Sequence, residues 1–313
     1  MKKCFKAGAL LLAAASLFSV GQDVQAGGGG SYPNGSESFL SGAVPPPGFY
    51  YLNYSYYYTA DSQKDDNGND VDSFDEITTV ANVSRFLWIS DITLFGGNYG
   101  QHLFVPYIDV SLDFHAPVGS YDDSSIPFLI YSPMVLAYHL MEGKLHVAVS
   151  PIDLYIPTGQ EDGNLAATGH NFWTFETAVA ITYMPNNWEF SAKFMYDFNT
   201  TQDNYANPLG LQVDRTPGQE FHFDYSCSYA LNPSWRVGVN GYYYVQTTDD
   251  NFKGPDAALL ERGEGNHSTV LAVGPGVWYN YQNMFFVLRT QYETMAKNKT
   301  EGNNVWFTFT YAF

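Results

Sequence analysis

The chain has 313 residues, and its 14 lysines and arginines stand against 32 aspartates and glutamates, which gives a formal net charge of −18. A protein this acidic repels phosphate backbones, so nucleic acid is excluded as an expected partner. Aromatic residues make up 17% of the chain, yet beyond the N-terminus it contains no run of about 18 apolar residues, which excludes a helical membrane protein. Membrane β-barrels have such a composition because lipid-facing residues alternate with polar residues that face the lumen.

The N-terminus has the pattern of a secretory signal peptide. Three lysines within the first six residues precede an apolar stretch at 7–20, and Val24-Gln25-Ala26 provides a small-x-small cleavage site. We therefore expect residues 1–26 to be removed on export. Cys227 is then the one cysteine left, so no disulfide framework is expected.

Residues 27–47 are rich in glycine, serine and proline and follow no period, so they are expected to be irregular. Irregular backbone does not cross lipid, because each unpaired polar group there costs several kcal/mol. Phe39-Leu40 and Ala43-Val44 nevertheless add apolar side chains that a solvated tail does not need. We therefore predict that this segment folds into the periplasmic mouth of the protein as a partial plug; a free periplasmic tail is the alternative.

From residue 48 onward, the chain divides into segments of roughly ten residues, which is the length that a tilted strand needs to cross the hydrocarbon. About twelve strands are predicted, at 48–59, 76–88, 99–114, 127–140, 144–157, 171–184, 188–200, 219–231, 235–248, 268–281, 284–297 and 303–313. An even number is typical of bacterial outer-membrane barrels. The predicted fold is therefore all-β, a transmembrane antiparallel up-and-down β-barrel over residues 48–313.

The predicted connections alternate between tight turns and long acidic loops. The tight turns are rich in residues that tolerate turn dihedral angles and lie at 141–144, 186–187, 232–234 and 282–283. The long connections lie at about 60–76, 115–126, 159–170, 201–218 and 249–267. Short periplasmic turns and long external loops are typical of outer-membrane barrels, so both termini are expected to face the periplasm.

The last strand predicts which face of the barrel meets lipid. One face has only apolar or aromatic side chains, at Val305, Phe307, Phe309, Tyr311 and Phe313. Phe313 is expected to anchor the last strand against the first and to be recognised by the outer-membrane assembly machinery. Trp188 and Trp235 directly follow tight turns, where the aromatic girdle of a membrane interface belongs.

The same alternation predicts a polar belt inside the barrel. Its members are Lys193, Asp197, His222, Asp224, Arg236, Asn240, Tyr242, Tyr244, Arg289 and Glu293. Arg289 and Glu293 share a face, but their Cα atoms lie about 13 Å apart, which is too far for a direct ion pair. Each is therefore expected to bond to groups on adjacent strands, Arg236 or Asp224 among them. The belt predicts either a path that orients an aromatic solute or a lumen in which ion pairs and hydrogen bonds simply satisfy buried polar groups.

Several short motifs in sequence order resemble those of outer-membrane proteins associated with the meta-pathway of phenol degradation. They are Pro45-Pro46-Pro47-Gly48, Gly96-Gly97-Asn98-Tyr99-Gly100, Ile156-Pro157-Thr158-Gly159, Gln219-Glu220-Phe221-His222-Phe223-Asp224-Tyr225 and Gly241-Tyr242-Tyr243-Tyr244-Val245-Gln246. The resemblance extends over essentially the whole exported chain. It implies a channel for uptake of hydrophobic or aromatic compounds and does not identify phenol as the solute.

The predicted function is therefore passive uptake of hydrophobic or aromatic small molecules across a Gram-negative outer membrane, without a cofactor. Lipid and lipopolysaccharide are the expected surroundings. A non-specific porin, or a structural or adhesive barrel, is the alternative. A wide continuous water channel would favour the porin, and an occluded lumen with an apolar pocket would favour the selective channel.

Catalysis and metal binding have weaker support in the sequence. A phospholipase would need serine and histidine together on the lipid side, but His146 and Ser150 are expected to point inward and no Gly-x-Ser-x-Gly elbow is present. Residues 65–70 are acidic, but Gly68 is two positions too early for an EF-hand turn, so no metal site is predicted there. We expect no enzyme activity.

Overall fold

The computed structural model describes residues 31–313 except 73, 116–118, 160–165, 167, 169–170, 206–210 and 260–266. The expected signal peptide, residues 1–26, lies outside the described residues. Two short 3-10 turns occur in the described part, η1 (Met141–Gly143) and η2 (Ala257–Leu259). No helix there is long and apolar enough to cross a membrane.

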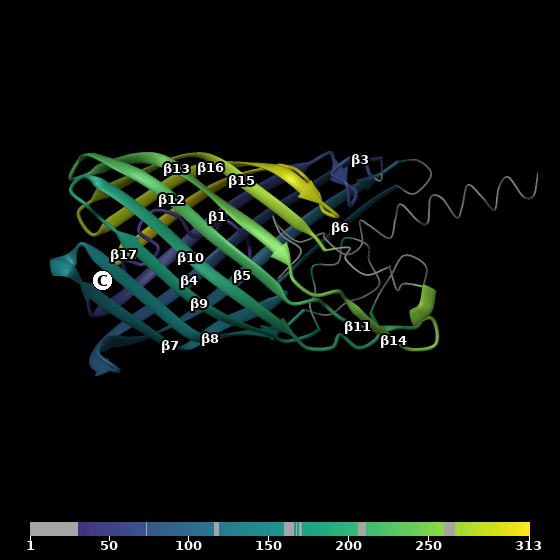
Figure 1. Ribbon diagram of the computed structural model, residues 1–313, viewed down its shortest axis with the longest axis horizontal. Coiled ribbons are helices and arrows are strands. Elements are labelled where there is room, and N and C mark those ends of the chain that lie inside the picture. Colours follow the sequence, from purple (N-terminus) through teal and green to yellow (C-terminus); the bar gives the residue numbers. More distant parts are fainter. Residues whose placement is uncertain are drawn as a thin grey trace, which may run out of the picture.

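Twelve long antiparallel strands form a closed barrel, which confirms the predicted fold (Figure 1). They are β1 (Gly48–Ala60), β4 (Glu76–Leu94), β5 (Gly97–Phe114), β7 (Phe128–Leu140), β8 (Leu145–Pro157), β9 (Thr174–Tyr183), β10 (Trp188–Asn199), β12 (Glu220–Asn232), β13 (Trp235–Gln246), β15 (Thr269–Tyr281), β16 (Met284–Lys297) and β17 (Asn303–Ala312). Each strand pairs with its sequence neighbours, and β1 also pairs with β17, so the sheet has no open edge along the barrel wall.

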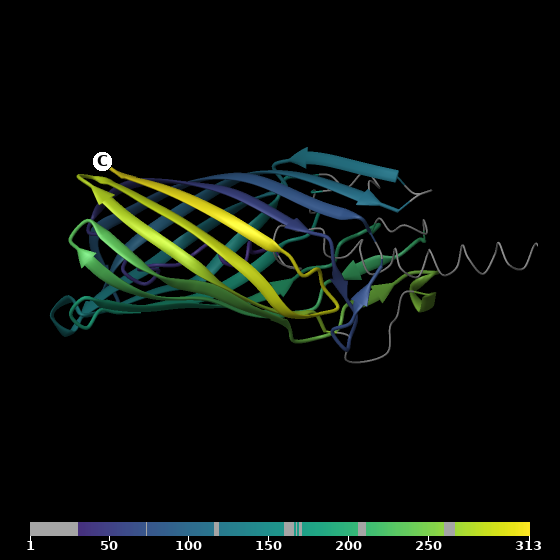
Figure 2. The same ribbon diagram turned by 90° about the horizontal axis from the view of Figure 1, so that it is seen from above.

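The two ends of the barrel differ in their connections (Figure 2). The end that carries the short turns and the C-terminus is called the turn end below, and the opposite end is called the loop end. Short extra strands lie in the loop-end connections: β2 (Gln63–Lys64), β3 (Asp70–Val71), β6 (Gly119–Ser125), β11 (Asp214–Thr216) and β14 (Asn251–Lys253). β6 extends the main sheet from β5, whereas β2 pairs with β3 and β11 with β14.

The barrel closes where the first strand meets the last. Tyr50 to Thr59 of β1 pair with Ala312 to Asn303 of β17 in continuous antiparallel register. Beyond the ladder, the Phe313 backbone N–H donates to the Phe49 carbonyl at 3.1 Å, and the two rings lie 5.5 Å apart. The terminal aromatic therefore contacts the strand that it was expected to hold.

The hairpin β4–β5 is longer than predicted. The sequence predicts strands at 76–88 and 99–114, but the ladder continues through Thr93 and Leu94 to a two-residue turn. Phe95 and Gly96 form that turn with φ of +51° and +85°. Turns with positive φ at both central positions match the right-handed twist of a hairpin, so the glycine-rich stretch is a fifth tight turn at the turn end rather than a loop.

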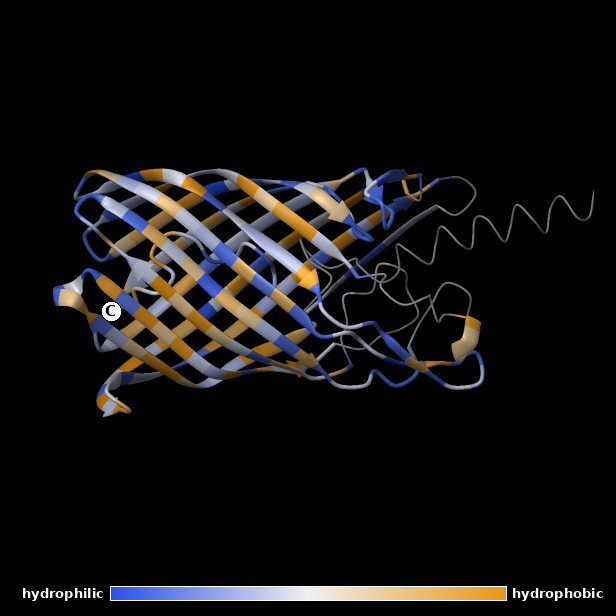
Figure 3. Cartoon of the chain, viewed as in Figure 1, coloured by the Kyte–Doolittle hydropathy of each residue, from blue (hydrophilic) through white to orange (hydrophobic). Residues whose placement is uncertain are grey.

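The alternation of hydropathy along the strands separates the outer face of the barrel from the lumen (Figure 3). On β10 the outward Phe190, Phe194 and Phe198 are 39–46% exposed, whereas the inward Glu189 and Asp197 are fully buried. A charge that faces lipid near the midplane would cost about 2–4 kcal/mol, so this distribution is the one that a membrane selects. Trp188 and Trp235 are exposed beside turn-end turns, and their rings pack on Tyr229 and Tyr279.

The ladder between β7 and β8 is interrupted near its middle. Pairing stops after Tyr131 with Leu154 and resumes at Leu136 with Val149. Pro133 and Pro151 lie inside the gap, and proline has no N–H to donate to a ladder. Inward side chains from this gap form one of the polar clusters described next.

Candidate lumen site

The segment 31–47 lies inside the barrel and runs toward the turn end from Ser31, whose hydroxyl lies 2.7 Å from Thr174 Oγ1 at the loop-end start of β9. Tyr32 and Phe39 are 5% and 7% exposed, and Asn34 is 1% exposed. A Cβ atom on Gly276 of β15 would lie 2.9 Å from Cζ of Phe39, so the wall provides a glycine where this ring packs. The irregular segment is therefore enclosed by the barrel.

Polar lumen side chains accept hydrogen bonds from the backbone of this segment. Asp224 of β12 accepts from the N–H of Gly35 at 2.8 Å and of Glu37 at 2.9 Å. Glu189 accepts from the N–H of Leu40 at 3.0 Å, and Thr182 Oγ1 accepts from the N–H of Gly42 at 2.9 Å. Buried backbone donors require such partners, so the polar wall allows irregular chain to lie at membrane depth.

Arg289 binds the same segment from the opposite wall. Its guanidinium donates to the carbonyl of Gly35 at 3.0 Å, to the carbonyl of Ser36, and to Thr308 Oγ1 at 3.3 Å. The prediction that Arg236 or Asp224 would be a partner of Arg289 or Glu293 is wrong. The reason is that residues 31–47 lie between the walls and meet Arg289 first.

Glu293 lies closer to the loop end and has a different environment. Its carboxylate accepts from Tyr58 Oη at 2.9 Å, from Tyr242 Oη and from the N–H of Gly302 at 2.7 Å. All three donors belong to the barrel or its connections. Glu293 therefore links β16 to β1 and β13 across the lumen instead of holding the N-terminal segment.

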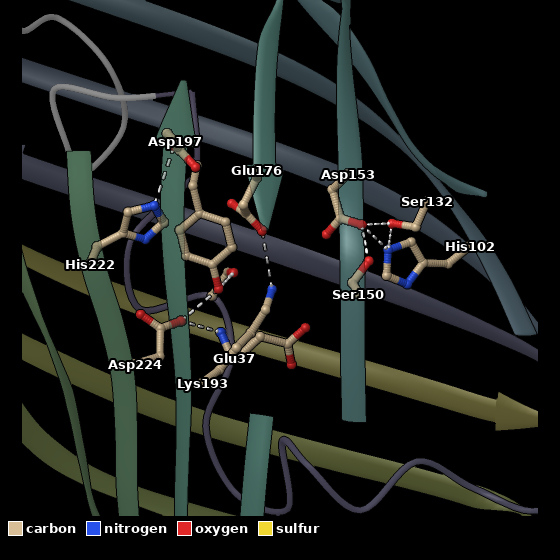
Figure 4. Close-up of polar contacts among 12 residues, drawn as sticks. Glu37, His102, Ser132, Ser150, Asp153, Glu176, Lys193, Asp197, His222 and Asp224 are labelled. Carbon is tan, nitrogen blue, oxygen red and sulfur yellow. Dashed lines mark hydrogen bonds and ion pairs between the residues drawn. The ribbon is translucent and has the colours of Figure 1, made fainter. Parts of the chain in front are cut away.

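The ten predicted lumen residues all point inward. Asp197, His222, Asp224, Arg236, Asn240, Tyr242, Tyr244, Arg289 and Glu293 are buried, and the side chain of Lys193 is 14% exposed. The structure brings Lys193, Asp197, His222 and Asp224 together on β10 and β12 (Figure 4). Arg236 lies apart, at the turn end, where it donates to Ser228 Oγ at 3.0 Å.

Four polar lumen residues were not singled out from the sequence: Arg85 on β4, His102 on β5, Ser132 on β7 and Asp153 on β8. Arg85 donates to Glu37 at 2.9 Å and to Tyr54 Oη at 3.1 Å, and its Nη2 lies 2.9 Å from His102 Nδ1. Asp153 accepts from Ser132 and Ser150 (Figure 4). The register of β8 shifts between Ser150 and Asp153, so a strict period of two that includes Ser150 places Asp153 on the wrong face. His102 keeps the alternation of β5, but its inward neighbours on that strand are apolar, so no polar face marks it.

Ser132, His102 and Asp153 do not form a catalytic triad. A guanidinium can only donate, so Arg85 fixes His102 Nδ1 as an acceptor and Nε2 as the protonated nitrogen. Nε2 faces Ser132 Oγ and therefore cannot take the serine proton. In addition, Asp153 contacts the serine and not the far side of the imidazole, as a triad would require.

The wall formed by β1 and β17 is aromatic rather than charged. Tyr54, Tyr56, Tyr58 and Trp306 are each at most 3% exposed and belong to one apolar cluster. The rings of Tyr56 and Trp306 lie 4.2 Å apart. Lumen-facing tyrosine and tryptophan on these strands alternate with outward Tyr57 and other aromatic residues, so hydropathy alone does not distinguish the two faces.

Two cavities lie along the lumen. The loop-side cavity has an empty volume of about 900 Å³, open solvent included, and is lined by the aromatic wall, Phe104, Phe128 and the carboxylates of Glu37 and Glu176. The turn-side cavity measures about 1360 Å³ on the same basis and is lined by residues 36–46 and by β1, β16 and β17. Ser36, Glu37 and Tyr54 border both cavities, so the N-terminal segment forms the partition.

Comparison with known proteins gives a family and a fold. A family model described as "Putative MetA-pathway of phenol degradation" matches residues 60–309, whereas no curated protein matches the chain. The COG4313 outer membrane channel from Pseudomonas putida F1 is similar in structure, with 15% identity, a TM-score of 0.73, and 86% of this chain and 97% of that chain covered. The transport unit of the autotransporter AIDA-I from Escherichia coli is similar at 9% identity and a TM-score of 0.50, with 84% and 90% covered.

Proposed function

Because the chain belongs to the family described as the putative MetA-pathway of phenol degradation, we propose that it is a channel for passive uptake of hydrophobic or aromatic small molecules. The chain is an outer-membrane β-barrel of a bacterium, and lipid surrounds its aromatic outer face. The solute enters at the loop end and leaves at the turn end. Neither energy nor a cofactor is needed for this movement.

The observation that carries the proposal is the loop-side cavity. Its lining combines tyrosine, phenylalanine and tryptophan rings with a few charged groups, of which Glu37, Glu176 and Lys193 are examples. Small-molecule sites are typically apolar and aromatic, with a small number of polar groups that orient the ligand. An aromatic solute is therefore matched to this space better than a sugar or an inorganic ion.

The N-terminal segment acts as a partial plug in this proposal. It separates the two cavities at Ser36 and Glu37, and it is held by hydrogen bonds to Asp224, Glu189 and Arg289. A solute that passes from one cavity to the other must displace or slip past this partition. The plug therefore limits leakage of water and ions while an aromatic solute exchanges between the cavities.

The alternatives differ from this proposal in what the lumen admits. A non-specific porin needs a continuous water channel, which a partition at Glu37 opposes. A structural or adhesive barrel would use its loops and would have no use for an aromatic cavity. An enzyme would need a competent nucleophile, and the His102 imidazole cannot take the proton of Ser132.

The proposal also includes two expected partners. Lipopolysaccharide contacts the acidic loops, and the assembly machinery recognises Phe313.

Uptake into liposomes tests the function. The purified full-length exported chain is reconstituted, and entry of neutral aromatic solutes is compared with entry of aliphatic alcohols and sugars of similar size. We expect the aromatic solutes to enter several-fold faster than protein-free liposomes allow, while sugars stay near background. Equal rates for all solutes of one size would show a porin, and background rates throughout would show a non-transporting barrel.

A further inference from the structure

Four buried carboxylic acids form a row across the charged wall. Asp153, Glu176, Asp197 and Glu220 lie directly opposite one another on β8, β9, β10 and β12, and each is at most 3% exposed. Like charges directly opposite each other on a sheet destabilise it. Such a row therefore needs protons or cations among its members.

The described residues neutralise only part of this row. Asp153 has hydroxyl donors from Ser132 and Ser150, whereas the ammonium of Lys193 lies 3.9 Å from Glu176 Oε1. Among the ion pairs of the described chain, Asp197 has one with His222, whose Nε2 lies 3.3 Å from Asp197 Oδ2. The centre of the row is thus short of positive charge.

Three residues at this centre also have buried atoms without a partner. Glu176 Oε1, Asp197 Oδ1 and His222 Nδ1 accept or donate no hydrogen bond, although their residues are 0–1% exposed. One potential ligand atom from each of the three lies within 4.8 Å of the others. Figure 4 shows Asp197 of β10 joined to His222 of β12, with Glu176 of β9 beside them and joined to Lys193.

We propose that Glu176, Asp197 and His222 bind a divalent transition-metal ion of the Zn²⁺ class. One imidazole nitrogen and two carboxylate oxygens are ligands that Zn²⁺ accepts, whereas Mg²⁺ and Ca²⁺ prefer oxygen alone. Tetrahedral Zn²⁺ with bonds of about 2.0–2.1 Å separates its ligands by roughly 3.3 Å. In the structure His222 Nε2 and Asp197 Oδ2 form a hydrogen bond at 3.3 Å, which the bound ion would replace.

The surroundings support an ion at this position. Tyr155 donates to Glu176 Oε2 at 2.9 Å, which is the kind of hydrogen bond that orients a metal-binding carboxylate. The Lys193 ammonium also lies 4.7 Å from the centre of the Tyr32 ring, so it has a second place to reside when the metal binds Glu176. Glu176 lines the loop-side cavity, through which an ion reaches the site.

The sequence did not point to this site because its residues are not a motif. Glu176 and His222 lie on strands separated by a third strand, and only the closed sheet brings them together with Asp197. The acidic run at 65–70 is the stretch of the sequence that looks most like a metal-binding loop. In that run Asp65 accepts hydrogen bonds from the N–H groups of Asn67 and Asn69, as in an ordinary turn.

Zn²⁺ titration of the full-length exported chain tests the proposal. The chain has seven histidines, and some of those outside the site are exposed, so the background variant replaces five of them with glutamine: His115, His139, His146, His170 and His267. After removal of metal with a chelator, Zn²⁺ alone is titrated against a competing chromophoric chelator in detergent. We expect one Zn²⁺ per chain. His222→Gln in this background should weaken binding at least tenfold, whereas His102→Gln, a buried lumen histidine outside the site, should not.

Two further measurements keep the result interpretable. Heat-modifiable migration in gels reports whether each variant still forms the barrel, and Glu176→Gln is an isosteric second variant that should also weaken Zn²⁺ binding tenfold. Co²⁺ added in place of Zn²⁺ should give visible absorption bands of a tetrahedral or five-coordinate site. The proposal is overturned if the folded background variant binds no Zn²⁺ at micromolar concentration, or if folded His222→Gln and Glu176→Gln bind it as the background does.

Discussion

The two sides of the lumen have opposite chemistry although they belong to one sheet. The wall of β1 and β17 presents Tyr54, Tyr56, Tyr58 and Trp306, whereas the wall of β8, β9, β10 and β12 presents carboxylates and histidine. Aromatic rings offer apolar surface and few acceptors, so they suit a solute that is itself aromatic. Carboxylates accept hydrogen bonds, so they suit an irregular backbone whose N–H groups have no strand partner.

The N-terminal segment makes use of this difference. Its N–H groups bind Asp224 and Glu189 on the charged wall, and Phe39 packs beside Gly276. The aromatic wall on the loop side thus remains free to border a cavity. The difference teaches that the polar lumen residues hold residues 31–47 on one side, which leaves the apolar side of the lumen to border a cavity.

Removal of the plug should have the largest effect. Deletion of residues 27–44 joins the two cavities by removing the partition at Ser36 and Glu37. We expect single-channel conductance in planar bilayers to rise several-fold. Deletion of 27–30 alone is the control and should leave conductance unchanged, and identical conductance for the two deletions would rule out a plug.

Loss of one acceptor on the charged wall should loosen the plug without removing it. Asp224→Asn keeps the side-chain shape but removes the charge that binds two N–H groups and Tyr32 Oη. A hydrogen bond to a charged group contributes about 1.5–3 kcal/mol, so the ratio of unseated to seated plug should rise on the order of tenfold or more. Open-channel events in bilayers measure this ratio. Glu220→Gln, on the same strand, is the matched control, and an equal effect there would argue against a specific contact.

Substitutions on the aromatic wall should change the rate of aromatic solute uptake and leave ion conductance unchanged. Trp306→Ala removes an indole that borders the loop-side cavity, whereas Phe307→Ala removes the next ring, which faces outward. We expect Trp306→Ala to slow aromatic uptake into liposomes about two- to five-fold, since the contact between two aromatic rings contributes roughly 1 kcal/mol. If Phe307→Ala slows uptake equally, the cavity is not the path.

Arg289→Ala should have the smallest effect of the four. The Gly35 carbonyl that it binds also accepts from Gln291 Nε2 at 3.3 Å, so part of the attachment remains. We expect about a two-fold rise in ion flux with unchanged insertion into membranes. Arg236→Ala, which removes a lumen arginine that donates to Ser228 and not to this segment, is the control and should leave the flux as it was.

Strand positions were predictable because lipid imposes a strict pattern. Each of the twelve predicted strands corresponds to one strand of the barrel, and the residues at Glu189 to Phe198 alternate as expected. A membrane tolerates few charges on the lipid-facing side of a strand, so apolar and polar residues alternate with a period of two where the register is regular. The end of the β4–β5 hairpin was not predicted, because residues 89–98 were assigned neither to a strand nor to a tight turn, although positive φ at Phe95 and Gly96 makes one there.

The site was predictable only on strands with regular register and polar inward residues. Lys193, Asp197, His222 and Asp224 are such residues, and they lie together in the lumen. Asp153 follows a register shift within β8, so its face could not be read by counting, whereas His102 keeps the regular alternation of β5 but lies among apolar inward residues. Trp306 lies on the inward face of β17, but its part in an aromatic wall depends on β1, which only closure of the barrel brings beside it.

Protection of the loop-side cavity by an aromatic solute tests the central claim most directly. In a Cys227→Ser background, Ala81→Cys places a thiol at the cavity, and Ser120→Cys places one on the exposed strand β6. The rates at which a small thiol reagent labels the two variants are measured with and without a neutral aromatic solute. We predict that the solute slows labelling at position 81 several-fold and leaves position 120 unchanged. Equal labelling at position 81 with and without the solute, at concentrations that enter liposomes, would contradict uptake through the aromatic cavity.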